Sequence, residues 1–336
     1  NENQQNQIIV VSNLMLKAKM RPFPHFISFL TCLNSFKKSS QKDNSFDAFL
    51  RSLPSMLDTR NTRYFQPFIE NTTDLITNRN IYNSRATRWV TNSDDFEFSF
   101  DTVVKIIFPS LDLYCYANKD SSVIYDTKGV YYPIDNKWLG NGGKVNWERA
   151  GFTEKEVYAL LGDYQINMKF AKYEVDSVKF YNTNYFSSFL IGNLQEKVLS
   201  DVTEDRASYP RFSSYDKRLV IKNIFNDIDY EGGFAMFGAK LMGSGDKFQD
   251  AYLYFKKDGK IFVKTASKSY TIRKDRISSN FAAVSIFWKG DSIYHPGLEL
   301  KYIDITKELT LIRGLTDLSL SPFFDTYHKL DMYFEA

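Results

Sequence analysis

The sequence predicts an α+β protein that is mainly β, in which a small helical region at residues 1–93 precedes a β-rich domain at residues 94–336. Apolar residues recur at helical spacing in the first region and alternate with a period of two in the second. The chain also contains 29 Phe and 22 Tyr, and both residue types favour strands. Because 43% of its 336 residues are hydrophobic, it can bury a large core without metals or disulfides.

Four segments of the first region are expected to be helical; apolar residues recur at helical spacing in the second and third and at mixed spacing in the first. The four segments are residues 8–20, 26–36, 45–53 and 66–78. The third carries the clearest signal, because Phe46, Phe49 and Leu53 share one face and Ser45 is a candidate N-cap. We expect these apolar faces to form a core rather than a ligand groove.

Alternating segments begin near residue 94, where Phe96, Phe98 and Phe100 fall on one side. The closing stretch holds four further segments, at residues 292–302, 308–313, 317–320 and 329–336. The alternation continues to the final residue, so we expect the β-rich domain to be truncated there and its last strand to be covered by more of a longer polypeptide.

Asp-Ser pairs open strand-like runs at positions 120, 176 and 291, which are 56 and 115 residues apart. Because these separations are close to one and two periods, they favour a β-solenoid or β-helix-like domain. The alternative is a β domain of several sheets.

Two further local signals concern turns and helix ends. Gly140, Gly142 and Gly143 lack the spacing of a phosphate-binding loop, so we interpret them as a tight turn between strands. Thr153 and Glu156 match a capping box, which predicts a short helix that ends at Gly162.

Composition excludes several classes of function. A formal net charge of +3 gives no electrostatic basis for binding nucleic acid, and no apolar run is long enough for a membrane helix. The three His lie at no metal-ligand spacing, so we expect no metal, no cofactor and no catalytic residue. Cys32 and Cys115 are expected to be buried and free, although they could form a single bridge.

Aromatic residues gather beside the glycine turn and are the best candidates for binding. They are Tyr131, Tyr132, Trp138 and Trp147. Exposed rings of this kind can stack on sugars, whereas buried ones fill a core. These four residues are therefore our candidates for a glycan site, although core packing is the more usual role of such rings.

Three short motifs suggest a setting: Asp101-Thr102-Val103, Asp176-Ser177-Val178 and Asp291-Ser292-Ile293. They resemble the Asp-[Ser/Thr]-apolar acceptor of O-glycosylation in envelope proteins of Bacteroidota. Residues 138–151, 176–181 and 292–336 also look like parts of large, uncharacterised, β-rich envelope proteins of that phylum. The resemblance implies an exported module with glycans on Thr102, Ser177 and Ser292, and it implies no activity.

From these observations we expect a non-enzymatic structural or binding module of a larger exported bacterial envelope protein. The alternative is a carbohydrate-binding or polysaccharide-processing β-helix domain, by analogy of fold alone. Its partners would be the remainder of its own polypeptide or other envelope proteins, and a glycan. Its location would be periplasmic, outer-membrane-associated or extracellular.

Overall fold

The computed structural model describes residues 2–58, 61–117, 119–199, 203–313, 321–325 and 330–332. The protein is mainly β, with a helical region at its N-terminal end, as predicted. Packing divides the chain into two compact units. Unit 1 comprises Asn1–Val145, Leu160–Asp176 and Gln195–Val202, and unit 2 comprises Asn146–Ala159, Ser177–Leu194 and Thr203–Ala336.

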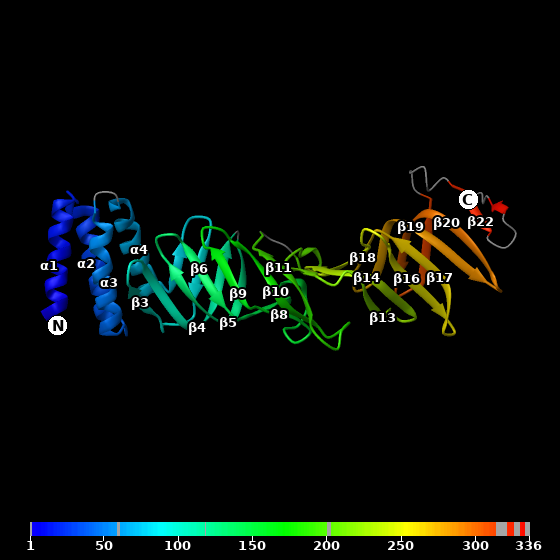
Figure 1. Ribbon diagram of the computed structural model, residues 1–336, viewed down its shortest axis with the longest axis horizontal. Helices are drawn as coiled ribbons and strands as arrows, with labels where there is room; N and C mark the ends of the chain where they lie inside the picture. The colour runs from blue at the N-terminus through cyan, green and yellow to red at the C-terminus, as the bar shows by residue number, and fades with distance from the viewer. Residues whose placement is uncertain are drawn as a thin grey trace. The chain divides into compact units, whose positions relative to one another are not determined.

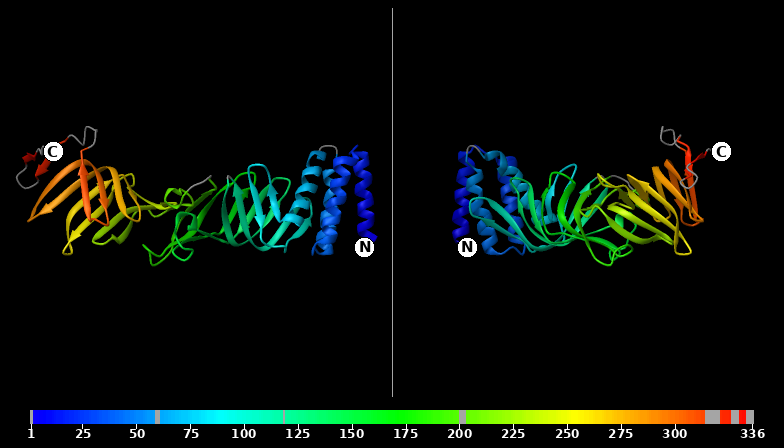
Figure 2. Two further views of the ribbon diagram at one scale, coloured as in Figure 1. Left: turned by 180° about the vertical axis from the view of Figure 1, so that it is seen from behind. Right: turned by 45° about the vertical axis from the view of Figure 1, so that its right-hand side comes forward.

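Four α-helices open unit 1 and stand side by side (Figures 1 and 2). They are α1 (Glu2–Lys17), α2 (Ile27–Lys38), α3 (Asp43–Met56) and α4 (Thr62–Asn78), with a short π-helical turn at Pro22–Phe26 before α2. Each overlaps a segment that the apolar spacing predicted to be helical. Among the described residues, no helix combines the length and the apolar character needed to cross a membrane.

Aromatic rings join these helices to the first strands. The ring of Phe49 in α3 lies 4.7 Å from that of Phe36 in α2 and 5.7 Å from that of Phe98 in β3 (Glu97–Phe100). Ser45 is not the predicted N-cap, because α3 begins at Asp43. Instead its buried hydroxyl accepts the backbone N–H of Phe98 at 2.9 Å, so it ties helix to sheet.

The sheet of unit 1 begins earlier than residue 94, since its first two strands follow α4 directly. Its strands are β1 (Asn80–Asn83), β2 (Arg88–Thr91), β3, β4 (Val104–Ala117), β5 (Asp120–Tyr132), β6 (Lys137–Asn141) and β9 (Asp163–Asn167). They pair antiparallel in the order β1–β2–β4–β5–β6–β9, and β3 pairs with the first half of β4.

The long strand β4 changes neighbours at a break in its middle. Its register with β5 shifts between Phe108 and Leu113, beside Pro109. Proline has no N–H for the ladder, so within sheets it is confined to edges and bulges, and bulges bend strands. Pro296 in β20 (Asp291–Ile303) lies at a similar shift between β19 (Arg276–Trp288) and β20.

Unit 2 consists mostly of antiparallel strands. Those after residue 203 are β12 (Arg211–Ser214), β13 (Leu219–Phe225), β14 (Ile228–Phe237), β15 (Lys240–Ser244), β16 (Ala251–Lys257), β17 (Lys260–Ser267), β18 (Ser269–Ile272), β19, β20, β21 (Glu308–Ile312), β22 (Phe323–Asp325) and β23 (Leu330–Met332). Earlier in the chain, β7 (Lys144–Asn146), β8 (Val157–Leu160), β10 (Lys172–Asn182) and β11 (Leu190–Lys197) contribute residues to both units.

Six strands of unit 2 pair in a closed cycle, β14–β15–β18–β19–β17–β16–β14. The cycle closes because β14 and β19 each pair with different neighbours along their two halves. Tyr230, Leu253, Thr265 and Tyr270 of these strands are completely buried. The hydroxyls of Thr265 and Tyr270 are 2.8 Å apart.

The predicted solenoid is not confirmed. Every pairing whose register is described is antiparallel, whereas the strands of a β-helix pair in parallel. In the closing stretch, residues 292–302 and 308–313 match β20 and β21. Residues 317–320 and most of 329–336 lie outside the described residues.

The helix predicted from the capping box is wrong. The Thr153 N–H does donate to the Glu156 carboxylate at 2.8 Å, but the chain then enters β8 at Val157. Val157 and Ala159 are completely buried, while Tyr158 and Leu160 are not. This alternation is typical of a strand with one buried face. Core packing on one face of a strand therefore outweighs a single turn of capping bonds.

Two local predictions are confirmed. Gly142 and Gly143 form the turn between β6 and β7 with φ of 71° and 116°, a region that glycine enters without steric cost. Cys32 and Cys115 are both buried, and they form no disulfide with each other. Burial raises the pKa of the Cys32 thiol to about 12, so this group is inert as a nucleophile at neutral pH.

Candidate functional site

The aromatic residues predicted to bind sugar lie mostly in the core. Trp138 and Trp147 have no exposed surface, Tyr131 is 1% exposed and Tyr132 is half-buried. Trp138 packs on Phe108 at 5.5 Å in unit 1, and Trp147 packs on Phe180 at 5.1 Å in unit 2. A buried ring has no free face for a sugar, so Tyr131, Trp138 and Trp147 offer no stacking platform.

The three motif residues differ in accessibility. Thr102 is exposed in the turn between β3 and β4, and Ser177 is exposed within β10, where its φ is 56°. Ser292 is half-buried at the start of β20, and its N–H donates to Asp291 at 2.6 Å.

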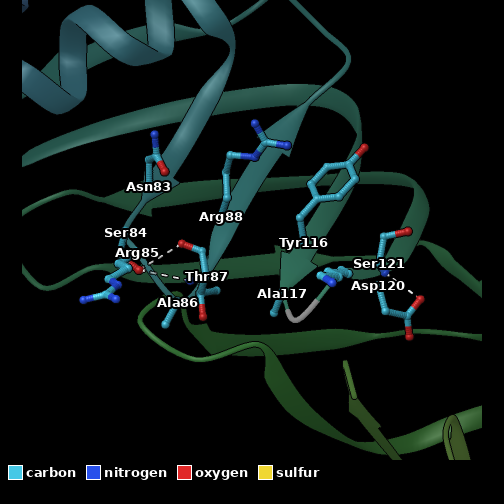
Figure 3. Close-up of a pocket in the computed structure, with 11 residues that line it drawn as sticks. Asn83, Ser84, Arg85, Ala86, Thr87, Arg88, Tyr116, Ala117, Asp120 and Ser121 are labelled. Carbon is cyan, nitrogen blue, oxygen red and sulfur yellow. Dashed lines mark hydrogen bonds between the residues drawn. The ribbon is translucent and has the colours of Figure 1, made fainter. Parts of the chain in front are cut away.

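A pocket of about 600 Å³ opens at one end of the sheet of unit 1 (Figure 3). It lies between two hairpin tips, the one that joins β1 to β2 and the one that joins β4 to β5. Its lining residues are Asn83, Ser84, Arg85, Ala86, Thr87, Arg88, Tyr116, Ala117, Lys119, Asp120 and Ser121.

Strand register places four of these residues in one row. Asn83 pairs with Arg88, Arg88 with Tyr116, and Tyr116 with Ser121 across β1, β2, β4 and β5. Residues directly opposite in antiparallel strands project from the same face. Amide, guanidinium, phenol and hydroxyl groups therefore stand side by side (Figure 3).

Arg88 and Tyr116 form the centre of the row. The guanidinium lies 4.8 Å from the centre of the Tyr116 ring, in a cation–π contact. Tyr116 is 37% exposed and stacks in turn against Tyr114 two residues earlier. The ring thus restrains the Arg88 side chain while the N–H groups at the edge of the guanidinium can still reach a ligand.

Hydrogen bonds hold both hairpin tips. The Ser84 hydroxyl donates to the Thr87 carbonyl at 3.0 Å and accepts the Thr87 N–H at 3.1 Å. On the other side, the Asp120 carboxylate accepts the Ser121 N–H at 2.8 Å. These local bonds pre-arrange the pocket before any ligand arrives.

Cations outnumber carboxylates in this pocket. Its lining includes the cations Arg85, Arg88 and Lys119 and a single carboxylate, that of Asp120. Within the described part of the chain, neither arginine forms an ion pair. The arrangement suits a carboxylate, sulfate or phosphate group, because a guanidinium can bind two of its oxygens at once.

Sequence reasoning missed this row. The alternation at residues 111–117 predicted a strand, but it carried no information about which strands would lie beside it. Nor do His, Cys, Asp and Glu side chains cluster in threes to hold a metal, as far as the chain is described.

Comparisons with known proteins identify no relative. No family model, curated protein or solved structure matches the chain. The site must therefore be interpreted from its own chemistry.

Proposed function

We propose that this chain is a non-enzymatic structural or binding module of a larger exported bacterial envelope protein. The three Asp-Ser and Asp-Thr motifs motivate the envelope setting. The exposure of Thr102 and Ser177 supports it, because a glycosylated hydroxyl must be accessible.

We keep the internal repeat predicted from the sequence as part of this proposal, with antiparallel hairpins as its units. Long strands with a break in register recur at β4–β5 and again at β19–β20. These two hairpins, one in each unit, would be the repeated element, in place of the parallel coils of a β-helix.

The binding activity is assigned to the pocket between the hairpin tips, and the observation that carries it is the row of Asn83, Arg88, Tyr116 and Ser121. Its amide and hydroxyl groups match the hydroxyls of a sugar, and its arginine matches an acidic substituent. Of the two carbohydrate alternatives, binding and processing, this row favours binding. The ligand class is an acidic glycan.

An array of neutral and acidic glycans tests the proposal with the 336-residue protein. We expect acidic glycans to bind, and Arg88→Ala to weaken binding about tenfold, the loss that follows from one charged hydrogen bond. The matched control is Arg63→Ala, because Arg63 also lies over a tyrosine, 4.7 Å from the Tyr64 ring, but outside the pocket. Equal binding of neutral and acidic glycans, or equal effects of the two variants, would refute this assignment.

The envelope setting has its own test. Peptide mass spectrometry of the protein from its native host should show a glycan on Thr102, which Thr102→Ala removes. An unmodified Thr102 in protein recovered from the cytoplasm would contradict the setting and leave the binding assignment standing.

A further inference from the structure

A second cavity, of about 300 Å³, lies within unit 2. It opens between the turn that precedes β8, the loop that follows β10 and the ends of β13, β15 and β18. Small-molecule sites in proteins usually measure about 300–1,000 Å³, so this cleft suits a compact ligand.

The floor of the cleft is apolar. It is formed by Ile224, Met236, Leu241 and Ile272, each no more than 6% exposed. They come from four strands, and each lies on the buried face of its strand. A ligand that reaches them must carry an apolar body, because an unpaired polar group there would lose its hydrogen bonds to water.

The lining of the cleft includes two cations, Arg273 and Lys274, and one carboxylate, that of Glu156, and the described hydrogen bonds of both cations go to backbone carbonyls. Arg273 donates to the backbone carbonyl of Asp205 at 2.9 Å. Lys274 donates to the carbonyl of Gly151 at 3.0 Å, with its ammonium 4.6 Å from the centre of the Phe152 ring. Neither forms an ion pair within the described residues, so both keep N–H donors for an anion.

The nearby carboxylates are bonded within their own turns. Glu156 accepts the Thr153 N–H, and this bond lowers the pKa of its carboxyl group. Asp205 accepts the hydroxyl of Thr203 at 2.7 Å, which likewise lowers its pKa. The charges of Lys274 and Arg273 add to the lowering of the pKa of Glu156 and Asp205 respectively, but no hydrogen bond or ion pair joins these cations to these carboxylates among the described residues. An anionic ligand would therefore share the attraction of the two cations with the carboxylates without breaking a bond between them.

We propose that this cleft binds a small amphipathic carboxylate, with its apolar body on the floor and its carboxylate at Lys274 and Arg273. The site is independent of the polar row in unit 1, and either assignment can fail without the other.

Calorimetric titration of the 336-residue protein with octanoate tests the proposal. Two comparison ligands are titrated in the same way: octanol, which lacks the carboxylate, and acetate, which lacks the apolar body. We expect octanoate to bind at one site, octanol to bind at least several-fold more weakly, and acetate not to bind. Saturable binding of octanol with equal affinity, or no binding of octanoate, would overturn the proposal.

Two variants locate the site. Lys274→Gln removes an exposed charge and should weaken octanoate about tenfold, and Ala239→Phe should fill the cleft and abolish binding. The matched control is Lys289→Gln, since Lys289 also lies over an aromatic ring, 5.7 Å from Trp288 in unit 2. Should Ala239→Phe fail to fold, Lys274→Gln decides, because equal affinities for Lys274→Gln and Lys289→Gln would overturn the assignment.

Discussion

The substitution Tyr230→Phe removes a single hydroxyl group. We expect it to destabilise unit 2 more than the loss of so small a group suggests. Tyr230 is completely buried, and its hydroxyl donates to the Gly233 carbonyl at 2.6 Å while it accepts the Ser244 N–H at 3.0 Å. Gly233 and Ser244 are register partners in β14 and β15. The phenol therefore bridges a carbonyl and an N–H that belong to paired strands.

Two glycines make room for this bridge. A Cβ at Gly232 would lie 2.4 Å from the Tyr230 hydroxyl, and one at Gly243 would lie 2.7 Å from its ring. Without the hydroxyl, the carbonyl and the N–H that it bridges lose their shared partner. A buried group left without a partner costs about 1–3 kcal/mol, and slight closure of the two strands would recover part of it, so we expect a loss of about 2 kcal/mol.

Urea denaturation of the 336-residue protein measures the change, with circular dichroism as the signal. The control is Tyr294→Phe, which removes a hydroxyl from a side chain of unit 2 that is 37% exposed. We expect the control to change the free energy of unfolding by less than about 0.5 kcal/mol. A Tyr230→Phe protein as stable as the control would refute the structural role of the bridge.

Two further perturbations test other parts of the fold. The His295 ring is buried, and this burial holds its pKa below the ordinary value of 6.5. Its Nδ1 accepts the Gly297 N–H at 3.1 Å, and its Nε2 lies 2.8 Å from the Ser321 carbonyl. These two contacts fit the neutral form of the ring. The unfolded chain takes up the proton at higher pH than the folded one, so stability should fall as pH drops below about 6.5. Denaturation at pH 7.5 and 5.5 measures this fall as a difference in the free energy of unfolding. We expect that difference to be smaller for His295→Gln than for the native chain. In unit 1, Phe49→Ala should lower the free energy of unfolding by about 3–5 kcal/mol, since this buried ring contacts Phe36, Phe68 and Phe98. The thermal midpoint of unfolding measures the loss. A loss below about 1 kcal/mol would contradict the packing.

The local pattern of residues predicted most of the secondary structure. Phe and Leu at helical spacing predicted α2 and α3, and the alternation of Phe96, Phe98 and Phe100 predicted β3. These predictions succeed because a helix or strand exposes one face to the core at its own period, whatever the core contains. The capping box at Thr153 misled because the bond from the Thr153 N–H to the Glu156 carboxylate also forms in an isolated turn.

The glycan site shows where such reasoning stops. Trp138 and Trp147 are close in sequence, and proximity suggested a shared surface, yet each fills a different core. Arg88 and Tyr116 are 28 positions apart in sequence and lie directly opposite each other. Alternation indicates that a side chain faces out of a sheet, but it does not indicate what stands beside it on the next strand.

The sequence by itself determined most of the helices and strands and the face that each of them buries, because these depend on periods that can be counted along the chain. Only the tertiary structure decided that the strands pair antiparallel, that β14 and β19 bend between neighbours, and that Asn83, Arg88, Tyr116 and Ser121 form one row. The physical reason is that strand register arises from packing between distant segments, and a shift of one residue would turn the same side chains to the opposite face.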